Sequence, residues 1–191
     1  MGRPLAVAIT GGIAAGKSEA LAAFARHGAA TASSDELVHR LYREDDGLKD
    51  AVRDRWGDRV FAADGEVDRA EIGRIVFADR GELDWLEREL HPRVRAAVDR
   101  WVAAQTADVA VVEVPLLYET GGEARFDKVV VVTAPEEVRE ARRGVFADRE
   151  ARLVPEEEKV RRADYVFVND GSLYELDAFA ARVLEELTSS R

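Results

Sequence analysis

The sequence predicts an α/β protein with a five-stranded parallel sheet, and three observations support this prediction. Short apolar runs of strand length recur along the chain and alternate with helical segments. No hairpin signal joins one run to the next, so right-handed βαβ units are expected between them. With 191 residues, 47% of them hydrophobic, the chain can bury a core as a single domain. The expected strands are residues 5–9, 29–33, 109–114, 128–133 and 165–168.

The strand signals differ in strength. Residues 109–114 and 128–133 are continuous and mostly β-branched, which is typical of strands covered on both faces of a parallel sheet. Residues 29–33 give the weakest signal. The chain closes with an amphipathic helix expected over residues 173–187.

A long helical stretch separates the second expected strand from the third. Residues 35–106 read almost entirely as helix and are far too long for one crossover connection. We therefore expect a helical insertion about 35–106 within a single domain spanning 1–191. The insertion is either a substrate-binding subdomain or a purely structural layer.

The most informative segment is residues 11–18, GGIAAGKS, directly behind the first expected strand. It matches G-x-x-x-x-G-K-[ST] at each fixed position and is followed by a helical pattern. Glycines let the backbone approach a phosphate closely, and the amide groups at the helix start attract anions. A chance glycine-rich turn is the alternative, which this context disfavours. The residues expected to bind the nucleotide are Gly12, Ile13, Ala14, Ala15, Gly16, Lys17, Ser18 and Glu19.

Two side chains of this loop have specific expected roles. Lys17 would reach the β- and γ-phosphates of the nucleotide, and the Ser18 hydroxyl would ligate Mg²⁺. Glu113 lies at the end of the strongest expected strand. An acid there could hold Mg²⁺, or it could be a structural carboxylate bound by backbone amides. For Glu119 the structural interpretation is favoured.

Bulk properties exclude several classes of protein. The net charge of −10 argues against a general nucleic-acid binder, whose surface would be basic. No apolar run approaches the length of a membrane span, and no cysteine is present for disulfides or zinc–thiolate sites. We expect a cytoplasmic protein, a monomer or weak homo-oligomer, with neither a membrane nor a nucleic acid as partner.

Several segments, in order, resemble the dephospho-CoA kinase family. They are residues 9–18 (ITGGIAAGKS), 64–69 (DGEVDR), 75–77 (IVF), 90–92 (LHP), 113–119 (EVPLLYE) and 161–171 (RRADYVFVNDG). The resemblance implies a kinase-type P-loop NTPase fold of three layers with a lid. It also implies an enzyme that uses ATP and Mg²⁺ to phosphorylate the ribose 3′-hydroxyl of dephospho-coenzyme A. The products would be coenzyme A and ADP.

The chain departs from the family's pattern in the loop and beyond it. Ala14 and Ala15 stand where the family usually has Gly-Ser, a mild change if both keep ordinary φ angles. Glu19 replaces Thr and would repel a phosphate unless it points away. Ser33 replaces the first Asp of the family's D-A-D. The lid, about 139–158, is shorter than usual, with Leu153 in place of Gln.

Asp35 is the candidate for the acceptor chemistry. It follows the second expected strand, where an α/β sheet presents residues to a ligand at its carboxyl edge. An N-cap for the following helix is the alternative. With the resemblance, the preferred role is a general base, or a residue that orients the ribose hydroxyl.

Basic residues gather after the fourth expected strand, where a solvated helix face is the ordinary explanation. In a phosphoryl transferase an arginine there neutralises charge that moves to the bridging oxygen. Arg142 matches the family's lid arginine best, ahead of Arg143. The run comprises Arg139, Arg142, Arg143, Arg149 and Arg152.

The resemblance implies further contacts with the ligands. It places His91 in the acceptor site, although His91-Pro92 could equally be a helix junction. Thr10 and Pro115 are expected to contact the substrate as well. Asn169, in a turn after the fifth strand, is expected beside the adenine, and a simple turn is the alternative.

Other functions remain to be separated from this one. A kinase of nucleoside monophosphates or of another small metabolite would differ in its acceptor. A degenerate nucleotide-binding protein would bind without turnover. A guanine-nucleotide switch is disfavoured because the N-K-x-D motif is missing: the nearest string, VNDG at 168–171, lacks the lysine.

Overall fold

The computed structural model describes residues 3–143 and 153–189, and the chain divides into two compact units. The first unit comprises Met1–Ser33 and Trp101–Arg191, and the second comprises Ser34–Arg100. In the described residues, no helix combines the length and the apolar character needed to cross a membrane.

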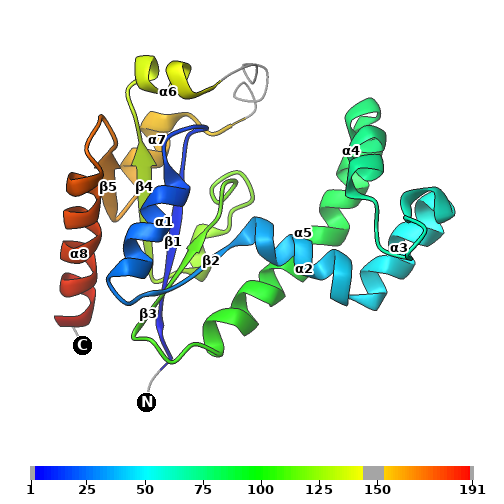
Figure 1. The fold of residues 1–191 in the computed structure, drawn as a ribbon, viewed down its shortest axis with the longest axis horizontal. Helices are drawn as coiled ribbons and strands as arrows, with labels where there is room; N and C mark the ends of the chain where they lie inside the picture. The colour runs from blue at the N-terminus through cyan, green and yellow to red at the C-terminus, as the bar shows by residue number, and fades with distance from the viewer. Residues whose placement is uncertain (1–2, 144–152, 190–191) are drawn as a thin grey trace. The chain divides into compact units, whose positions relative to one another are not determined.

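The first unit is built on the expected parallel sheet (Figure 1). Its strand order is β2-β3-β1-β4-β5, and every neighbouring pair is parallel. All five predicted strands are confirmed, with small shifts at their ends. They are β1 (Leu5–Gly11), β2 (Ala30–Ser33), β3 (Val109–Glu113), β4 (Lys128–Thr133) and β5 (Tyr165–Val168).

The strand register brings several strand ends to one edge of the sheet. Glu113 at the end of β3 lies opposite Ile9 of β1 and Ser33 of β2. Gly11, the last residue of β1, lies opposite Val132 of β4. The loop that follows β1 therefore leaves the sheet beside Glu113, because parallel strands end at the same edge.

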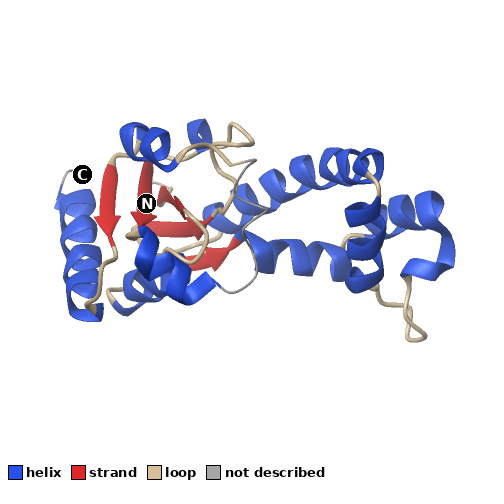
Figure 2. Ribbon diagram, turned by 90° about the horizontal axis from the view of Figure 1, so that it is seen from above, coloured by secondary structure: helices blue, strands red, loops and turns tan. Residues whose placement is uncertain are grey.

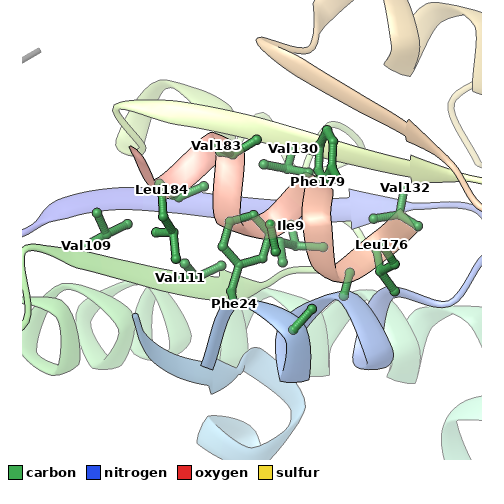
Figure 3. Packing of buried hydrophobic residues seen from close by; sticks show 14 of the residues in the cluster. Ile9, Phe24, Val109, Val111, Val130, Val132, Leu176, Phe179, Val183 and Leu184 are labelled. Atoms are coloured by element: carbon green, nitrogen blue, oxygen red, sulfur yellow. The ribbon is translucent and has the colours of Figure 1, made fainter. Parts of the chain in front are cut away.

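One face of the sheet is covered by α1 (Lys17–Arg26) and α8 (Leu173–Ser189). Figure 3 shows side chains of α8 meeting Phe24 of α1 and the inward residues of the strands, among them Val111 and Val130. Phe24 is fully buried, and burial of such a side chain contributes roughly 1.5–3 kcal/mol. Packing on this face holds the start of α1 against the sheet.

The opposite face carries a second cluster. Leu117 and Tyr118, which follow β3, pack with Val129 and Val131 of β4. Val160 of α7 (Glu156–Arg162) packs against the same cluster. The sheet therefore lies between two layers. The remaining helices of this unit in the described residues are η2 (Glu123–Arg125) and α6 (Glu136–Arg143).

The second unit, Ser34–Arg100, is described throughout and consists of helices with one isolated bridge between Phe61 and Val67 (Figure 2). Its core packs Trp56 edge-on against Trp85, with ring centroids 4.9 Å apart, beside Leu86. Its helices are α2 (Ser34–Glu44), α3 (Asp46–Trp56), η1 (Gly57–Val60), α4 (Arg69–Ala78) and α5 (Arg80–Ala103), the last of which continues into the first unit.

Pro92 does not mark a junction between two helices, so that interpretation of His91-Pro92 is wrong. It lies inside the continuous helix α5. A proline there has no N–H to donate to the carbonyl four residues earlier. The next side chain supports this turn, because Arg93 donates from Nη1 to the Glu89 carbonyl at 2.8 Å and to its carboxylate at 2.6 Å.

Candidate active site

The loop between β1 and α1 has the backbone that the sequence motif requires. Gly11 has φ 148°, and a Cβ there would lie 1.9 Å from the carbonyl oxygen of Val132. Gly16 is the N-cap of α1 with φ 96°, and no side chain caps the helix there. Helix-start amide groups that no side chain caps suit an anionic ligand. The loop has the form of a phosphate cradle.

Asn169 braces this loop from the end of β5. Its Nδ2 donates to the carbonyl of Ala15 at 2.8 Å, and the residue is buried. A Cβ on Gly16 would lie 2.2 Å from the same nitrogen, so the approach requires glycine. The side-chain amide is thus directed at the loop backbone. This positioning role was not apparent from the sequence.

Ala14 does not keep an ordinary φ angle. The replacement of the family's residue by alanine was expected to be mild only if it did. Its φ is 59°, and it is the non-glycine residue recorded with a positive φ among the described residues. A residue with a Cβ is strained in this left-handed region, and glycine is not. The substitution of alanine at this position of the loop therefore has an energetic cost.

Replacing Ala14 with glycine should stabilise the protein. Relief of the left-handed strain is partly offset by the larger entropy of glycine in the unfolded chain. We expect the free energy of unfolding to rise by up to about 1 kcal/mol, measured by urea denaturation. Ala15, which is fully buried beside it, is the matched control, and Ala15→Gly should destabilise. A lower stability for Ala14→Gly would contradict this assignment of strain.

The two polar side chains of the loop, Lys17 and Ser18, each contact a neighbouring group of the site. Lys17 donates from Nζ to the carbonyl of Gly12 at 2.8 Å, so its ammonium group folds back over the loop. Ser18 Oγ lies 3.3 Å from Oε2 of Glu113, which is 8% exposed. The structure therefore brings together the hydroxyl and the carboxylate that were proposed for Mg²⁺.

Glu19 points toward a cation and not toward the loop. Its Oε1 lies 3.2 Å from Nη1 of Arg26, in the last turn of α1. Arg26 is also bound to Asp177 at 2.8 Å. A carboxylate neutralised in this way repels a phosphate less than an isolated one. Any contact of Glu19 with nucleotide would therefore come from its backbone.

Two arginines of α6 approach the loop. Arg142 Nη1 lies 3.4 Å from the carbonyl of Ala14. Arg139 Nη1 would lie 3.0 Å from a Cβ on Gly12 and is paired with Glu156 at 3.7 Å. Arg143 is the last residue of α6. Arg149 and Arg152 lie outside the described residues, as does part of the expected lid.

Thr10 and Pro115 are joined to each other. The Thr10 hydroxyl donates to the Pro115 carbonyl at 3.4 Å, and Thr10 is fully buried. The bond ties β1 to the segment that follows β3. Contact of Thr10 with the substrate stays a prediction.

The remaining candidates belong to the helical unit. Asp35 is exposed and lies in the first turn of α2, which begins at Ser34, so it is a helical residue and not the cap of that helix. Because Asp35 lies inside α2, the interpretation of this residue as an N-cap is wrong. His91 is half-buried within α5.

A buried ion pair was missed by the sequence analysis. Lys159 is 2% exposed, and its Nζ lies 2.7 Å from Oε1 of Glu119. The same oxygen accepts from the backbone N–H of Val154 at 3.0 Å, so the structural interpretation of Glu119 is right but incomplete. The run EEEKVRR at 156–162 gives no signal that separates Lys159 from a solvated lysine.

The sequence and the fold of this chain are both similar to those of known proteins. A family model described as dephospho-CoA kinase matches residues 5–175. A dephospho-CoA kinase from Mesorhizobium japonicum is 39% identical, and the match covers 98% of each chain. The crystal structure of TT1252 from Thermus thermophilus has 34% identity and a TM-score of 0.80, covering 97% of this chain and 99% of that one.

The fold alone is also shared with a more distant structure. Dephospho-CoA kinase from Campylobacter jejuni is 24% identical with a TM-score of 0.74, covering 97% of this chain and 98% of that one. The predicted kinase-type P-loop fold is confirmed. Because the family match spans most of the sequence, this chain belongs to the dephospho-CoA kinase family.

Proposed function

We propose that this chain transfers the γ-phosphoryl group of ATP to the ribose 3′-hydroxyl of dephospho-CoA, giving coenzyme A and ADP. The family is one of enzymes, and its reaction is the ATP-dependent phosphorylation of dephospho-CoA. The observation that carries the proposal is the loop at the end of β1. At the edge of the sheet where the parallel strands end, this loop brings together a phosphate cradle, the Lys17 ammonium group and the Ser18–Glu113 pair.

Positioning and electrostatics supply most of the catalysis expected here. A transferring phosphoryl group spreads negative charge over its oxygens, and fixed donors and cations stabilise that charge. The amides of the loop would hold the phosphates, and Lys17 would exchange its bond to the Gly12 carbonyl for phosphate oxygens. Asn169 would keep the loop in the required shape through Ala15.

The residues at this edge fit Mg²⁺. The ion prefers oxygen ligands, usually one or two from protein together with water and phosphate oxygens. The Ser18 hydroxyl and the Glu113 carboxylate, 3.3 Å apart, are of this kind. In the described residues, no group of three acidic, histidine or cysteine side chains forms a closed metal cage. Bound there, Mg²⁺ would neutralise phosphate charge.

The acceptor is proposed to be handled by Asp35 and His91 of the helical unit and by Pro115, which follows β3 in the first unit. Asp35, an exposed carboxylate two residues after β2, would accept or orient the proton of the 3′-hydroxyl. His91 and Pro115 would contact dephospho-CoA. The insertion about 35–106 is then a substrate-binding subdomain, and residues about 139–158 form a short lid within a single kinase domain.

The proposal extends to the protein's location, oligomeric state and partners. We propose a cytoplasmic monomer or weak homo-oligomer without a nucleic-acid partner. The net charge of −10 supports the last point, since nucleic-acid binding requires a basic surface.

A coupled assay tests the proposed reaction directly. Purified protein with ATP and Mg²⁺ should release ADP in the presence of dephospho-CoA. Phosphate on the ribose 3′-oxygen of the product should be visible by ³¹P NMR. Nucleoside monophosphates and shikimate, offered at the same concentration, should give little ADP. Turnover with one of these instead would support another small-molecule kinase. ATP binding without turnover on any acceptor would indicate a degenerate binding protein.

Arg142→Ala should lower kcat by about tenfold or more while changing the KM for ATP less. The reason is that a guanidinium beside the Ala14 carbonyl can engage charge as it develops on the phosphates. Steady-state kinetics at several ATP concentrations measure both constants. Arg182→Ala, on the exposed side of α8, is the control and should leave both unchanged. An unchanged kcat for Arg142→Ala would remove this residue from the mechanism.

A further inference from the structure

We propose that Arg139 is a second arginine that binds the nucleotide's phosphates, and that it leaves Glu156 for them when the nucleotide binds. The proposal rests on the proposed function, because it needs a nucleotide in the loop. Nothing in the sequence pattern distinguished Arg139 from the other arginines of its run, so the inference comes from the tertiary structure alone.

The first observation is how closely Arg139 approaches the loop. A Cβ on Gly12 would lie 3.0 Å from Arg139 Nη1 and 3.0 Å from Glu156 Oε2. The ends of these two side chains therefore occupy the space beside Gly12, and a larger residue there would have to displace them. A guanidinium group thus lies against the loop backbone at its first turn. The side chain of Arg139 is 16% exposed, so most of it is buried at this place.

The second observation is the nature of its ion pair. The Arg139 Nη1–Glu156 Oε2 separation is 3.7 Å, which is longer than a hydrogen bond. Such a pair attracts electrostatically but has not closed into the short, directional geometry of a bidentate contact. A phosphate offers the guanidinium group more negative charge and good geometry. The exchange of partner is therefore favourable once a nucleotide occupies the loop.

Glu156 is held where it is by the sheet and by α7. Thr133, buried at the end of β4, donates its hydroxyl to Glu156 Oε1. The start of α7 is anchored by the buried Lys159–Glu119 pair and by the Val154 N–H on the same carboxylate. When Arg139 turns away, Glu156 keeps its bond to Thr133. The carboxylate is thus a fixed competitor for the guanidinium group.

Space for the exchange is present. A cavity of about 200 Å³ lies beside the loop. It is lined by Gly12, Arg139, Leu153, Val154, Pro155, Glu156 and Lys159. Arg139 and Arg142 are three residues apart on α6 and so share one face of that helix. Arg142 reaches the Ala14 carbonyl, and Arg139 reaches Gly12, so the two cations contact the loop at two places.

This exchange predicts opposite effects for the two partners. Arg139→Gln should weaken ATP binding by about tenfold, because a charge-assisted contact is lost. Arg139→Lys should recover most of that loss. Glu156→Gln should tighten ATP binding by a few-fold, since it keeps the side chain's shape and removes the competing charge. Adenosine, which has no phosphate, should bind all variants equally.

Isothermal titration of ATP, ADP and adenosine into each variant measures these effects. Arg182→Gln on α8 is the matched control and should bind ATP as the parent does. Thermal unfolding of every variant separates binding from folding. If Arg139 and Glu156 were only a structural pair, both variants would lower the melting temperature and neither would change ATP affinity. That result would overturn the proposal, as would weaker ATP binding by Glu156→Gln.

Lys17→Ala in the same titration separates failure of this proposal from failure of the proposed function. Loss of ATP binding in Lys17→Ala with normal binding in Arg139→Gln would leave the reaction standing and reject the role of Arg139. Absence of ATP binding by the parent protein would reject the proposed function itself. If Arg139→Gln does not fold, Arg139→Lys and Glu156→Gln still decide the question, because both keep the side-chain volume nearly constant.

Discussion

Lys17→Ala is expected to lower turnover on the order of 10²–10³-fold and to weaken ATP binding. Among residues 11–18, all of which the structure describes, Lys17 is the side chain that carries a full positive charge. Its ammonium group already lies over the loop, at the Gly12 carbonyl. Its removal leaves the β- and γ-phosphate charge without that stabilisation in the transition state. ADP release in the coupled assay measures turnover, and titration calorimetry measures ATP affinity.

The effect should be chemical and not structural. Lys17 is not part of the buried core, so the far-ultraviolet circular dichroism of the variant should match that of the parent. Lys128→Ala is a suitable control: Lys128 begins β4 at the far end of the strand and pairs with Asp164 at 2.8 Å. It should leave turnover unchanged. A Lys17→Ala rate within a few-fold of the parent's would remove the loop from the mechanism.

Asp35→Asn is expected to lower turnover roughly 10²–10⁴-fold, the usual contribution of a general base. The substitution keeps the size of the side chain and a hydrogen-bonding oxygen but removes the charge that would accept the 3′-hydroxyl proton. Affinity for ATP should hardly change, because the proposed role is toward the acceptor. Initial rates at saturating ATP and dephospho-CoA, with ATP affinity measured separately, test both parts.

A neighbouring carboxylate gives a matched control. Glu36 is exposed in the same first turn of α2, so Glu36→Gln removes an equivalent charge near the helix start. Both substitutions should change stability slightly and equally through the helix dipole, by a few tenths of a kcal/mol to about 1 kcal/mol each. Only Asp35→Asn should abolish most of the turnover. Equal, near-normal rates for the two variants would end the claim for Asp35, and Glu113 would be tested next.

The fold was predictable because its signals are local in the sequence. Residues 128–133 are a continuous β-branched run, and β4 has those bounds. The weakest strand prediction, for residues 29–33, starts one residue too early. The strand observed there, β2, is short and pairs with β3 alone. The loop at 11–18 was equally visible, since glycine, lysine and serine occupy fixed places along the chain.

The position of Pro92 was less predictable. Proline suits the first turn of a helix, so a junction at 91–92 was one of the two interpretations of the sequence. The structure instead continues α5 through it. Tertiary packing along the helix, with Leu86 before the proline and Val98 after it buried, outweighs the loss of one backbone hydrogen bond.

By itself the sequence determined the parallel sheet, the phosphate loop and the residue types available for phosphoryl transfer. Each of these depends on residues close together in the chain. The tertiary structure alone decided the left-handed conformation of Ala14, the burial of Lys159 against Glu119 and the approach of Arg139 and Glu156 to Gly12. These features depend on contacts between segments that lie 40 or more residues apart, or on a backbone angle that packing imposes, and neither is encoded in a local pattern.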